Sequence, residues 1–199
     1  MKEAEAKTSA SFSHKKQPGI KIPLLLIPIM AEISNICLIV LPALTIVAAL
    51  YDLTTMKIPN WISGFLILGF FPTALILGLS LDVVAVSVAL AIAALLMGAG
   101  MFALNWIGGG DAKLMAASIL WMGLSGSLPF LLYTALAGGG FCILLMTARR
   151  HLQVFAVTGP NWIIRLMQPK GDIPYGVAIA IGALLAYPSS PLMTAFIAG

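Results

Sequence analysis

The chain has 199 residues, of which 60% are hydrophobic and only 9% are charged. A soluble domain of this size would lack the polar residues needed to cover its surface, so the composition excludes a soluble globular protein. The formal net charge of +4 accompanies no nucleic-acid-binding motif, so we expect no nucleic-acid partner and interpret the charge as membrane topology.

The N-terminal segment differs in composition from the rest of the chain. Its polar, small and lysine-containing residues are typical of a flexible tail, which we assign to residues 1–22. Residues 23–199 are expected to form one membrane-embedded domain. The first stretch of that domain, IPLLLIPIMAE, is too short to cross a bilayer comfortably and ends at Glu32. Three interpretations stay open for it: an interfacial segment, an extension of a tilted first helix, or a signal-like segment ending at Ala31.

Long apolar blocks follow, and several of them approach the ~20 residues that cross a bilayer core. Lipid offers no hydrogen-bond partners to an open backbone, so we expect an all-α polytopic membrane protein. The fourth block is short, and we expect its neighbours to shield it in part. About six transmembrane helices are predicted: Ile33–Tyr51, Trp61–Leu79, Val83–Ile107, Ala112–Leu124, Leu128–Ala148 and Pro174–Leu192.

The charges of the connecting segments predict the orientation. The connections at 52–60, 108–113 and 149–173 carry Lys and Arg, whereas the opposite connections carry neither. The positive-inside rule therefore puts the first set in the cytoplasm. The lysines of the tail do not fit this scheme, because six spans place the tail outside, and its location stays open. Three tryptophans lie near the cytoplasmic end and suit a membrane interface: Trp61, Trp106 and Trp162.

Two aspartates, Asp52 and Asp111, emerge at the cytoplasmic ends of predicted helices and at similar depth. The chain between them crosses the membrane twice and returns to the same face, so the topology permits a pair. Two carboxylates in contact cannot both ionise cheaply, and a shared proton lets one act as general base and the other as general acid. Such a pair hydrolyses a peptide bond with no metal and no cofactor, and we expect neither.

Three glycines precede the second aspartate in the segment GGGDAK. We expect Gly108, Gly109 and Gly110 to end the third helix, where a positive φ is cheap only for glycine. Their lack of side chains would also admit a substrate backbone next to Asp111. A substrate peptide should bind extended, by strand-like pairing with such a loop. Lys113 is expected to steady the local negative charge or to contact lipid headgroups.

Simpler interpretations stay open for the same residues. Asp111 suits the N-cap of the fourth helix, Lys113 suits an ordinary positive-inside anchor, and Asp52 suits a turn. A second glycine triplet, AGGGF at Ala137–Phe141, lies in the middle of a span without an acid. It indicates close packing of helices.

Together these segments resemble the type IV prepilin peptidases, which are membrane-embedded Gly-x-Gly-Asp aspartic proteases. The block GGGDAK matches the second catalytic motif of that family, and the block DLTTMKIPN matches the first. A third block, IPYGVAIAIGAL at Ile173–Leu184, is similar to the opening of the family's last helix. The resemblance runs from about residue 33 to the end and implies that Asp52 and Asp111 are the catalytic dyad.

The resemblance also implies a biological role. It implies an aspartic endopeptidase of the inner (cytoplasmic) membrane that removes the short basic leader of pilin-like precursors at the cytoplasmic face. Its partners would be the precursor and the lipid bilayer, and a homo-oligomer stays open.

Two features distinguish the chain from larger members of that family. Those members carry an added cytoplasmic domain with paired Cys-x-x-Cys motifs and also methylate the new N-terminus. Here the two cysteines, Cys37 and Cys142, lie in separate apolar blocks. The chain therefore resembles the compact branch of tight-adherence (Flp) pili, and methyltransferase activity is not expected. The first motif also has one lysine, Lys57, where relatives commonly carry several basic residues.

Functions of other classes stay open. A small membrane transporter would use its acids to bind protons or cations, although such sites usually lie near the bilayer midplane. A non-catalytic subunit of a pilus or secretion assembly would tolerate replacement of both aspartates. Within the protease class, archaeal preflagellin peptidases have the same kind of Gly-x-Gly-Asp motif, whereas the IPYG block favours the bacterial prepilin peptidases.

Overall fold

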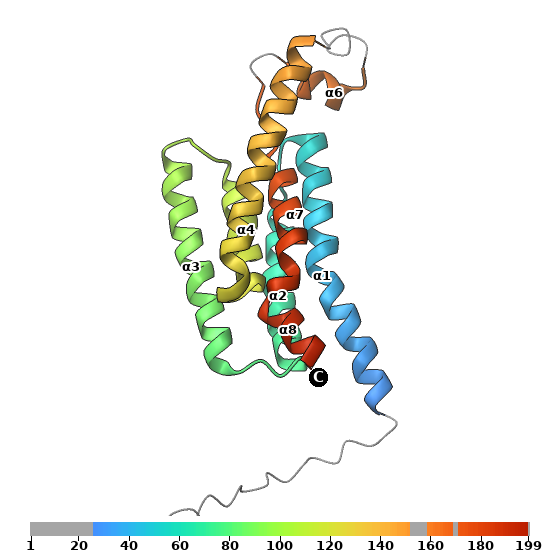
Figure 1. Cartoon of the computed structure of the whole chain (residues 1–199). Helices are drawn as coiled ribbons and strands as arrows, with labels where there is room; N and C mark the ends of the chain where they lie inside the picture. The colour runs from blue at the N-terminus through green and yellow to red at the C-terminus, as the bar shows by residue number, and fades with distance from the viewer. Residues whose placement is uncertain (1–25, 152–158, 169–170, 199) are drawn as a thin grey trace, which may run out of the picture.

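A computed structural model describes residues 26–151, 159–168 and 171–198, with side chains from Glu32 onward. The predicted tail over residues 1–22 lies outside these ranges. The described chain is helical and contains no strand, which confirms the expected all-α class (Figure 1). The elements are α1 (Leu26–Thr55), α2 (Asn60–Ile76), α3 (Leu81–Ala103), α4 (Gly109–His151), α6 (Asn161–Leu166), α7 (Tyr175–Ala186), the 3₁₀ turn η1 (Tyr187–Ser189) and α8 (Pro191–Ala198).

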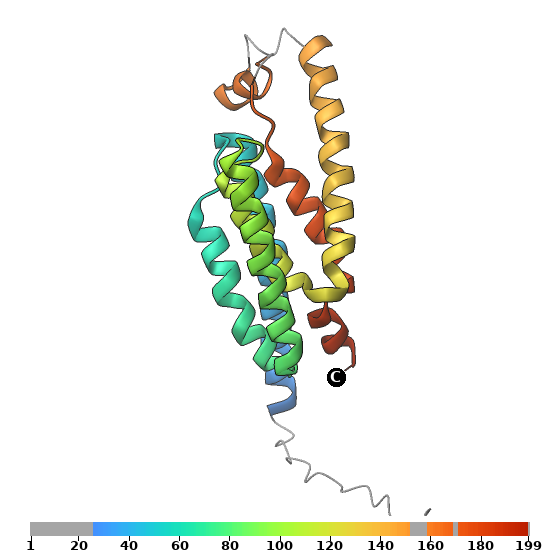
Figure 2. The ribbon, with the colours of Figure 1, turned by 90° about the vertical axis from the view of Figure 1, so that its left-hand side faces the viewer.

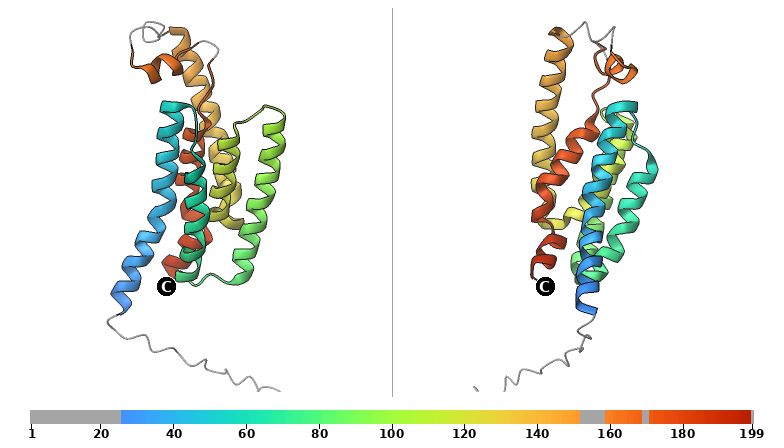
Figure 3. Two further views of the ribbon diagram at one scale, coloured as in Figure 1. Left: turned by 180° about the vertical axis from the view of Figure 1, so that it is seen from behind. Right: turned by 90° about the vertical axis from the view of Figure 1, so that its right-hand side faces the viewer.

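The first three helices run alternately up and down, so their ends gather at two ends of a bundle (Figure 1). The last turn of α1 and the first turns of α2, α4 and α7 meet at one end, which we call the upper end from its place in Figure 1. Helix α8 lies at the opposite end. Helix α7 packs against both α1 and α4 (Figure 3), so the C-terminal part of the chain joins the two motif-bearing helices.

Helix α4 is bent back on itself at Gly123. This residue has φ 55° and ψ −160°, and Figure 2 shows the chain reversing here, so residues 109–122 form a first arm and residues 124–151 a second. Glycine is needed for its conformation and for space, because a Cβ would lie 2.6 Å from Cγ of Pro191. The arms correspond to the fourth and fifth predicted spans. The first arm is largely buried, as expected for a short span shielded by its neighbours.

The predicted count of about six spans is not confirmed. Within the described chain, four segments are long and apolar enough to cross a membrane: Glu32–Thr55, Leu81–Ala103, Gly109–His151 and Tyr175–Ala198. The count is lower because Gly109–His151 is taken as one segment although the chain reverses within it at Gly123, and because α2 has only 17 residues. Helix α1 begins at Leu26 and not at Ile33, so the interpretation of the preceding apolar stretch as a helix extension is confirmed from Leu26 onward.

The interior depends on close packing, since lipid removes most of the hydrophobic drive between helices. Trp121 of the first arm is fully buried at the centre, where its indole N–H donates to the Leu66 carbonyl oxygen at 2.8 Å. Small residues let backbones approach: a Cβ on Gly98 of α3 would lie 2.8 Å from that of Ala112. In the second glycine triplet, Gly138 faces Ala178 of α7, which confirms close packing for this one residue.

Candidate active site

Asp52 lies in the last turn of α1 and is almost fully buried, with 5% of its surface exposed. Its Oδ2 accepts a hydrogen bond of 2.6 Å from the backbone N–H of Gly176, in the first turn of α7. The first N–H groups of a helix have no partner within it, and the helix dipole favours a negative charge there. The start of α7 therefore holds the Asp52 carboxylate in place.

Gly176 is the residue that permits this approach. A Cβ at this position would lie 2.8 Å from Asp52 Oδ2, 2.9 Å from Asp52 Cβ and 3.0 Å from Cδ1 of Ile58. Any larger residue would push the carboxylate or α7 away. The glycine of the IPYG block, which sequence reasoning noted only through a family resemblance, thus has a direct structural role.

Asp111 is the third residue of α4 and is half-buried. Its Oδ2 accepts a hydrogen bond of 3.2 Å from the backbone N–H of Gly108, immediately before the helix. The alternative of an N-cap residue is therefore wrong, because Asp111 lies inside the first turn and reaches back to the preceding loop. In both aspartates one carboxylate oxygen, Oδ2, is held by the backbone of a glycine.

The two aspartates line the same cavity of about 320 Å³ at the upper end. The other walls come from Met56, from the loop over residues 105–108 and from residues 172–175. The structure thus brings together the two acids that sequence analysis placed at matching depth.

The cavity also contains strained backbone. Among the described residues, Met56 with φ 55° and Asn105 with φ 58° are the non-glycine residues of positive φ, and both line this cavity. Asparagine tolerates the left-handed region, whereas methionine does so at a cost. Such residues concentrate at functional sites, where the surrounding structure holds them.

The glycines of GGGDAK begin α4 and do not end α3, which stops at Ala103. The expected positive φ is also wrong, because none of the three adopts it. Glycine serves close approach here: a Cβ on Gly108 would lie 2.8 Å from Asp111 Oδ2, and one on Gly110 would lie 3.0 Å from Cβ of Ile58. Gly109 faces the ring of Phe102. Only Gly108 of the three lines the cavity.

Lys113 does not join the aspartates. Its Nζ donates to Asn60 Oδ1 at 2.9 Å, at the start of α2, and it lines a different cavity. Two residues along a helix correspond to a rotation of about 200°, so Lys113 lies on the opposite face of α4 from Asp111. The expectation that this lysine steadies the charge at Asp111 finds no support in that placement.

Two residues of the site were missed by sequence reasoning. Asp172 is exposed and lines the cavity, adding a third carboxylate. Arg149, near the end of α4, donates to the carbonyl oxygens of Leu166 at 2.9 Å, Gly171 at 2.8 Å and Asp172 at 2.8 Å. Arg149 therefore fixes the segment that leads into the cavity wall. It had been interpreted only as a loop charge, and no local pattern indicates its long-range partners.

The chemistry available here follows from these groups. Two carboxylates line one small cavity, and glycine N–H groups donate to both. Among the described residues, no three side chains of His, Cys, Asp or Glu gather in a group that would hold a metal ion. A carboxylate pair of this kind can share one proton, and can then accept a proton from water at one member while donating from the other.

Comparison with known proteins adds an independent observation. A family model described as the type IV leader peptidase family matches residues 39–143. The matched range is more than half of the chain and includes both aspartates and the glycine triplet at the start of α4. No curated protein and no solved structure matches the chain.

Proposed function

The chain belongs to the type IV leader peptidase family, and on this premise we propose that it cleaves prepilin-type precursors with Asp52 and Asp111 as its catalytic dyad. The observation that carries the proposal is that two acids far apart in the sequence line one small cavity. In a membrane protein, ionisable groups that meet in a cavity are expensive to place and are usually functional.

The proposed reaction needs one proton on the pair. The ionised carboxylate takes a proton from a water molecule, and that water attacks the scissile carbonyl carbon. The protonated carboxyl group donates to the carbonyl oxygen and so stabilises the developing charge. When the tetrahedral intermediate collapses, the C–N bond breaks and the leaving amine takes a proton. The shared proton belongs to the pair, so neither aspartate is assigned as the acid.

The backbone hydrogen bonds give this pair its geometry. Each aspartate has Oδ2 fixed by a glycine N–H, from Gly176 or from Gly108, so Oδ1 remains for water or for the other carboxyl group. Fixed donors cost no reorganisation during the reaction. Burial of Asp52 also limits competition from bulk water.

The precursor is proposed to bind as an extended peptide along the irregular walls of the cavity. Residues 105–107 and 171–174 are not helical, so strand-like pairing can use the backbone groups that are not already bonded there. The N–H groups of Asn105 and Trp106 and the carbonyl oxygens of Gly171 and Asp172 already have partners within the protein. Trp106 and Tyr175 are 69% and 42% exposed at this cavity and offer flat apolar surface beside the peptide. A basic leader would be attracted by the exposed carboxylate of Asp172.

The branch of the family, the membrane and the absence of a second activity are also proposals. We place the chain in the compact tight-adherence branch, in the inner membrane, without methyltransferase activity. In the described structure Cys37 and Cys142 are free and belong to α1 and α4, so they form no Cys-x-x-Cys pair. Mass spectrometry of a processed precursor tests the absence of methyltransferase activity, because methylation would add one CH₂ group, about 14 Da, to the new N-terminus.

Replacement of either aspartate by asparagine tests the proposed function. Co-expression with a candidate prepilin, followed by gel shift, should show that Asp52→Asn and Asp111→Asn each slow leader removal by at least about 10²-fold, the usual contribution of a general acid or base. Asp82→Asn is the matched control, since Asp82 is an exposed acid in the first turn of α3 at the far end of the bundle. Near-normal cleavage by an inserted Asp52→Asn or Asp111→Asn protein would contradict the assignment of that residue.

A further inference from the structure

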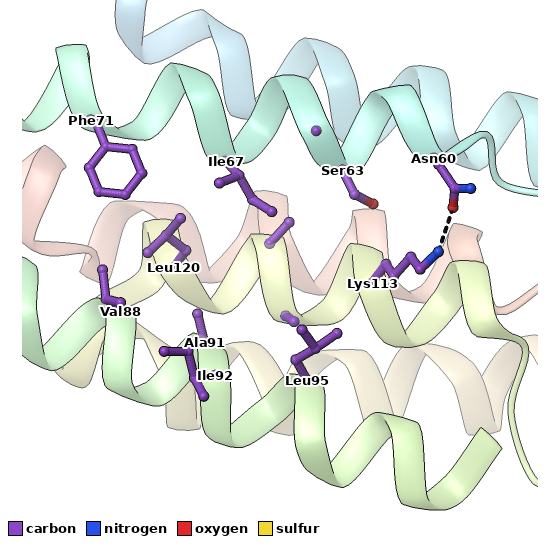
Figure 4. Close-up of a pocket in the computed structure, with 13 residues that line it drawn as sticks. Asn60, Ser63, Ile67, Phe71, Val88, Ala91, Ile92, Leu95, Lys113 and Leu120 are labelled. Atoms are coloured by element: carbon purple, nitrogen blue, oxygen red, sulfur yellow. Dashed lines mark hydrogen bonds between the residues drawn. The ribbon is translucent and has the colours of Figure 1, made fainter. Parts of the chain in front are cut away.

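A second cavity lies between α2, α3 and the first arm of α4 (Figure 4). Its volume is about 440 Å³, within the range of small-molecule sites. Apolar side chains form most of its wall, among them Ile67, Phe71 and Leu120. Polar groups gather at one end, the upper end of the bundle. The cavity is therefore amphipathic along its length.

The polar end carries a cation with donors to spare. Lys113 donates to Asn60 at 2.9 Å (Figure 4), and an ammonium group has three N–H donors. None of the described residues that line the cavity is acidic. Asn60 is the first residue of α2 and Lys113 the fifth of α4, so both lie near helix ends, the depth at which lipid headgroups meet a membrane protein. This end of the cavity thus favours an anion.

A buried hydroxyl group gives a second and independent sign of a ligand. Ser63 is only 4% exposed, and its Oγ has no hydrogen-bond partner. Figure 4 shows this oxygen pointing between α2 and α4, one turn along α2 from Asn60. Buried hydroxyl groups are normally paired, so an acceptor bound in the cavity would complete the site.

The position of this cavity argues against the precursor as its occupant. Lys113 lies on the opposite face of α4 from Asp111, so a helix held here would not lead its peptide to the dyad. A basic leader would also be repelled by Lys113. A molecule with an anionic head and an apolar tail matches both ends of the cavity.

We propose that this cavity is a binding site for one anionic phospholipid. Its phosphate accepts hydrogen bonds from Lys113 and Ser63, and one acyl chain lies along Ile67, Phe71 and Leu120. Basic pockets between transmembrane helices are known to recognise anionic headgroups in this way. The proposal depends on the membrane character of the protein and not on its catalytic activity.

Native mass spectrometry of the full chain in detergent tests the headgroup preference. Phosphatidylglycerol should be retained more than phosphatidylcholine with the same acyl chains, and Lys113→Gln should reduce this preference about fivefold. Lys57→Gln is the control, because Lys57 is an exposed lysine at the same end outside the cavity. Equal retention of both lipids, or an equal loss in Lys57→Gln, would overturn the proposal.

A glycine in the cavity wall allows a steric test. Gly64 lines the cavity, and a Cβ there meets nothing within 4 Å, so Gly64→Leu should fold and fill the space. It should abolish phosphatidylglycerol retention. Gly140→Leu is the matched control, since Gly140 is equally unobstructed, lies in the second arm of α4 and should retain the lipid. An unchanged melting temperature checks that both variants fold.

Two competitors identify the occupant. Glycerol phosphate carries the same headgroup chemistry without acyl chains and should displace the lipid only weakly. Full displacement by glycerol phosphate would indicate a free phosphate site, and displacement by the apolar segment of a precursor would indicate a substrate groove. Either result would overturn the lipid proposal.

Discussion

The two cavities of this protein share the first arm of α4 as a wall, yet they are built differently. The aspartate cavity is formed by helix ends and irregular backbone, with Asp52 and Asp111 held by glycine N–H groups. The second cavity, which Ser63 and Lys113 line, is formed by regular helix faces with polar groups at one end only. Regular helices leave few backbone groups unpaired, so they can offer an apolar surface but few fixed donors. Reactive geometry is found where helices begin and end.

The largest effect that separates the two cavities is expected at Gly176. In Gly176→Ala the new Cβ would lie within 3.0 Å of the Asp52 carboxylate and displace it. A misplacement of about 1 Å in a reacting group can cost 10²-fold in rate, so the kcat of leader cleavage should fall by up to about that factor. Phosphatidylglycerol retention should not change. Gly139→Ala, at a glycine where a Cβ meets nothing within 4 Å, serves as the control.

A result in which Gly176→Ala cleaves normally would show that the contact between α7 and Asp52 does not position the dyad. Loss of both leader cleavage and phosphatidylglycerol retention would show instead that α7 supports the whole bundle.

A smaller effect is expected at Arg149. Its guanidinium group donates to three carbonyl oxygens of the segment that ends at Asp172, so Arg149→Gln should loosen one wall of the aspartate cavity. Hydrogen bonds to charged groups contribute about 1.5–3 kcal/mol each, and we expect loss of part of this to raise KM about tenfold. Steady-state cleavage of a leader peptide measures the change.

Arg149→Lys should have nearly the same raised KM as Arg149→Gln, because an ammonium group cannot reproduce the planar fork that spans three carbonyl groups. Full rescue by lysine would mean that the positive charge alone matters and that these hydrogen bonds do not order the wall.

The smallest effect is expected at Asp172. This carboxylate is exposed, so its attraction for a basic leader is screened by solvent and salt. Asp172→Asn should raise KM about threefold at low ionic strength, leave kcat unchanged and lose this effect in ~1 M salt, where the Debye length is about 3 Å. Peptides with and without the basic residues of the leader make the comparison. A fall in kcat would show that Asp172 acts in the chemistry.

These regions also differ in how far the sequence could predict them. Topology permitted Asp52 and Asp111 to lie close together, since both acids lie at ends of apolar blocks on one side, and the family resemblance implied that they form a dyad. The contact between Asp52 and Gly176 joins residues far apart in the chain, and no local pattern carries that information. The three partners of Arg149 are distant for the same reason. Long-range hydrogen bonds depend on packing that periodicity alone does not specify.

The wrong expectations have local causes. The glycines next to Asp111 suggested positive φ, but in the structure they are needed for close approach to Ile58 and to the Asp111 carboxylate. Lys113 was grouped with Asp111 because the two are neighbours in sequence, whereas a helix turns residues two positions apart to opposite sides. The predicted count of six spans is not confirmed, because Gly109–His151 is one long apolar segment that reverses at Gly123 and α2 has only 17 residues.

The central claim is that Asp52 and Asp111 act as one unit, and a double-mutant comparison tests it most directly. Single-turnover cleavage of a prepilin by excess enzyme would be measured for Asp52→Asn, Asp111→Asn and the combined variant. Residues that act as a unit are strongly non-additive, so the combined variant should be within about threefold of the slower single variant. A combined loss equal to the product of the two single losses would contradict the dyad.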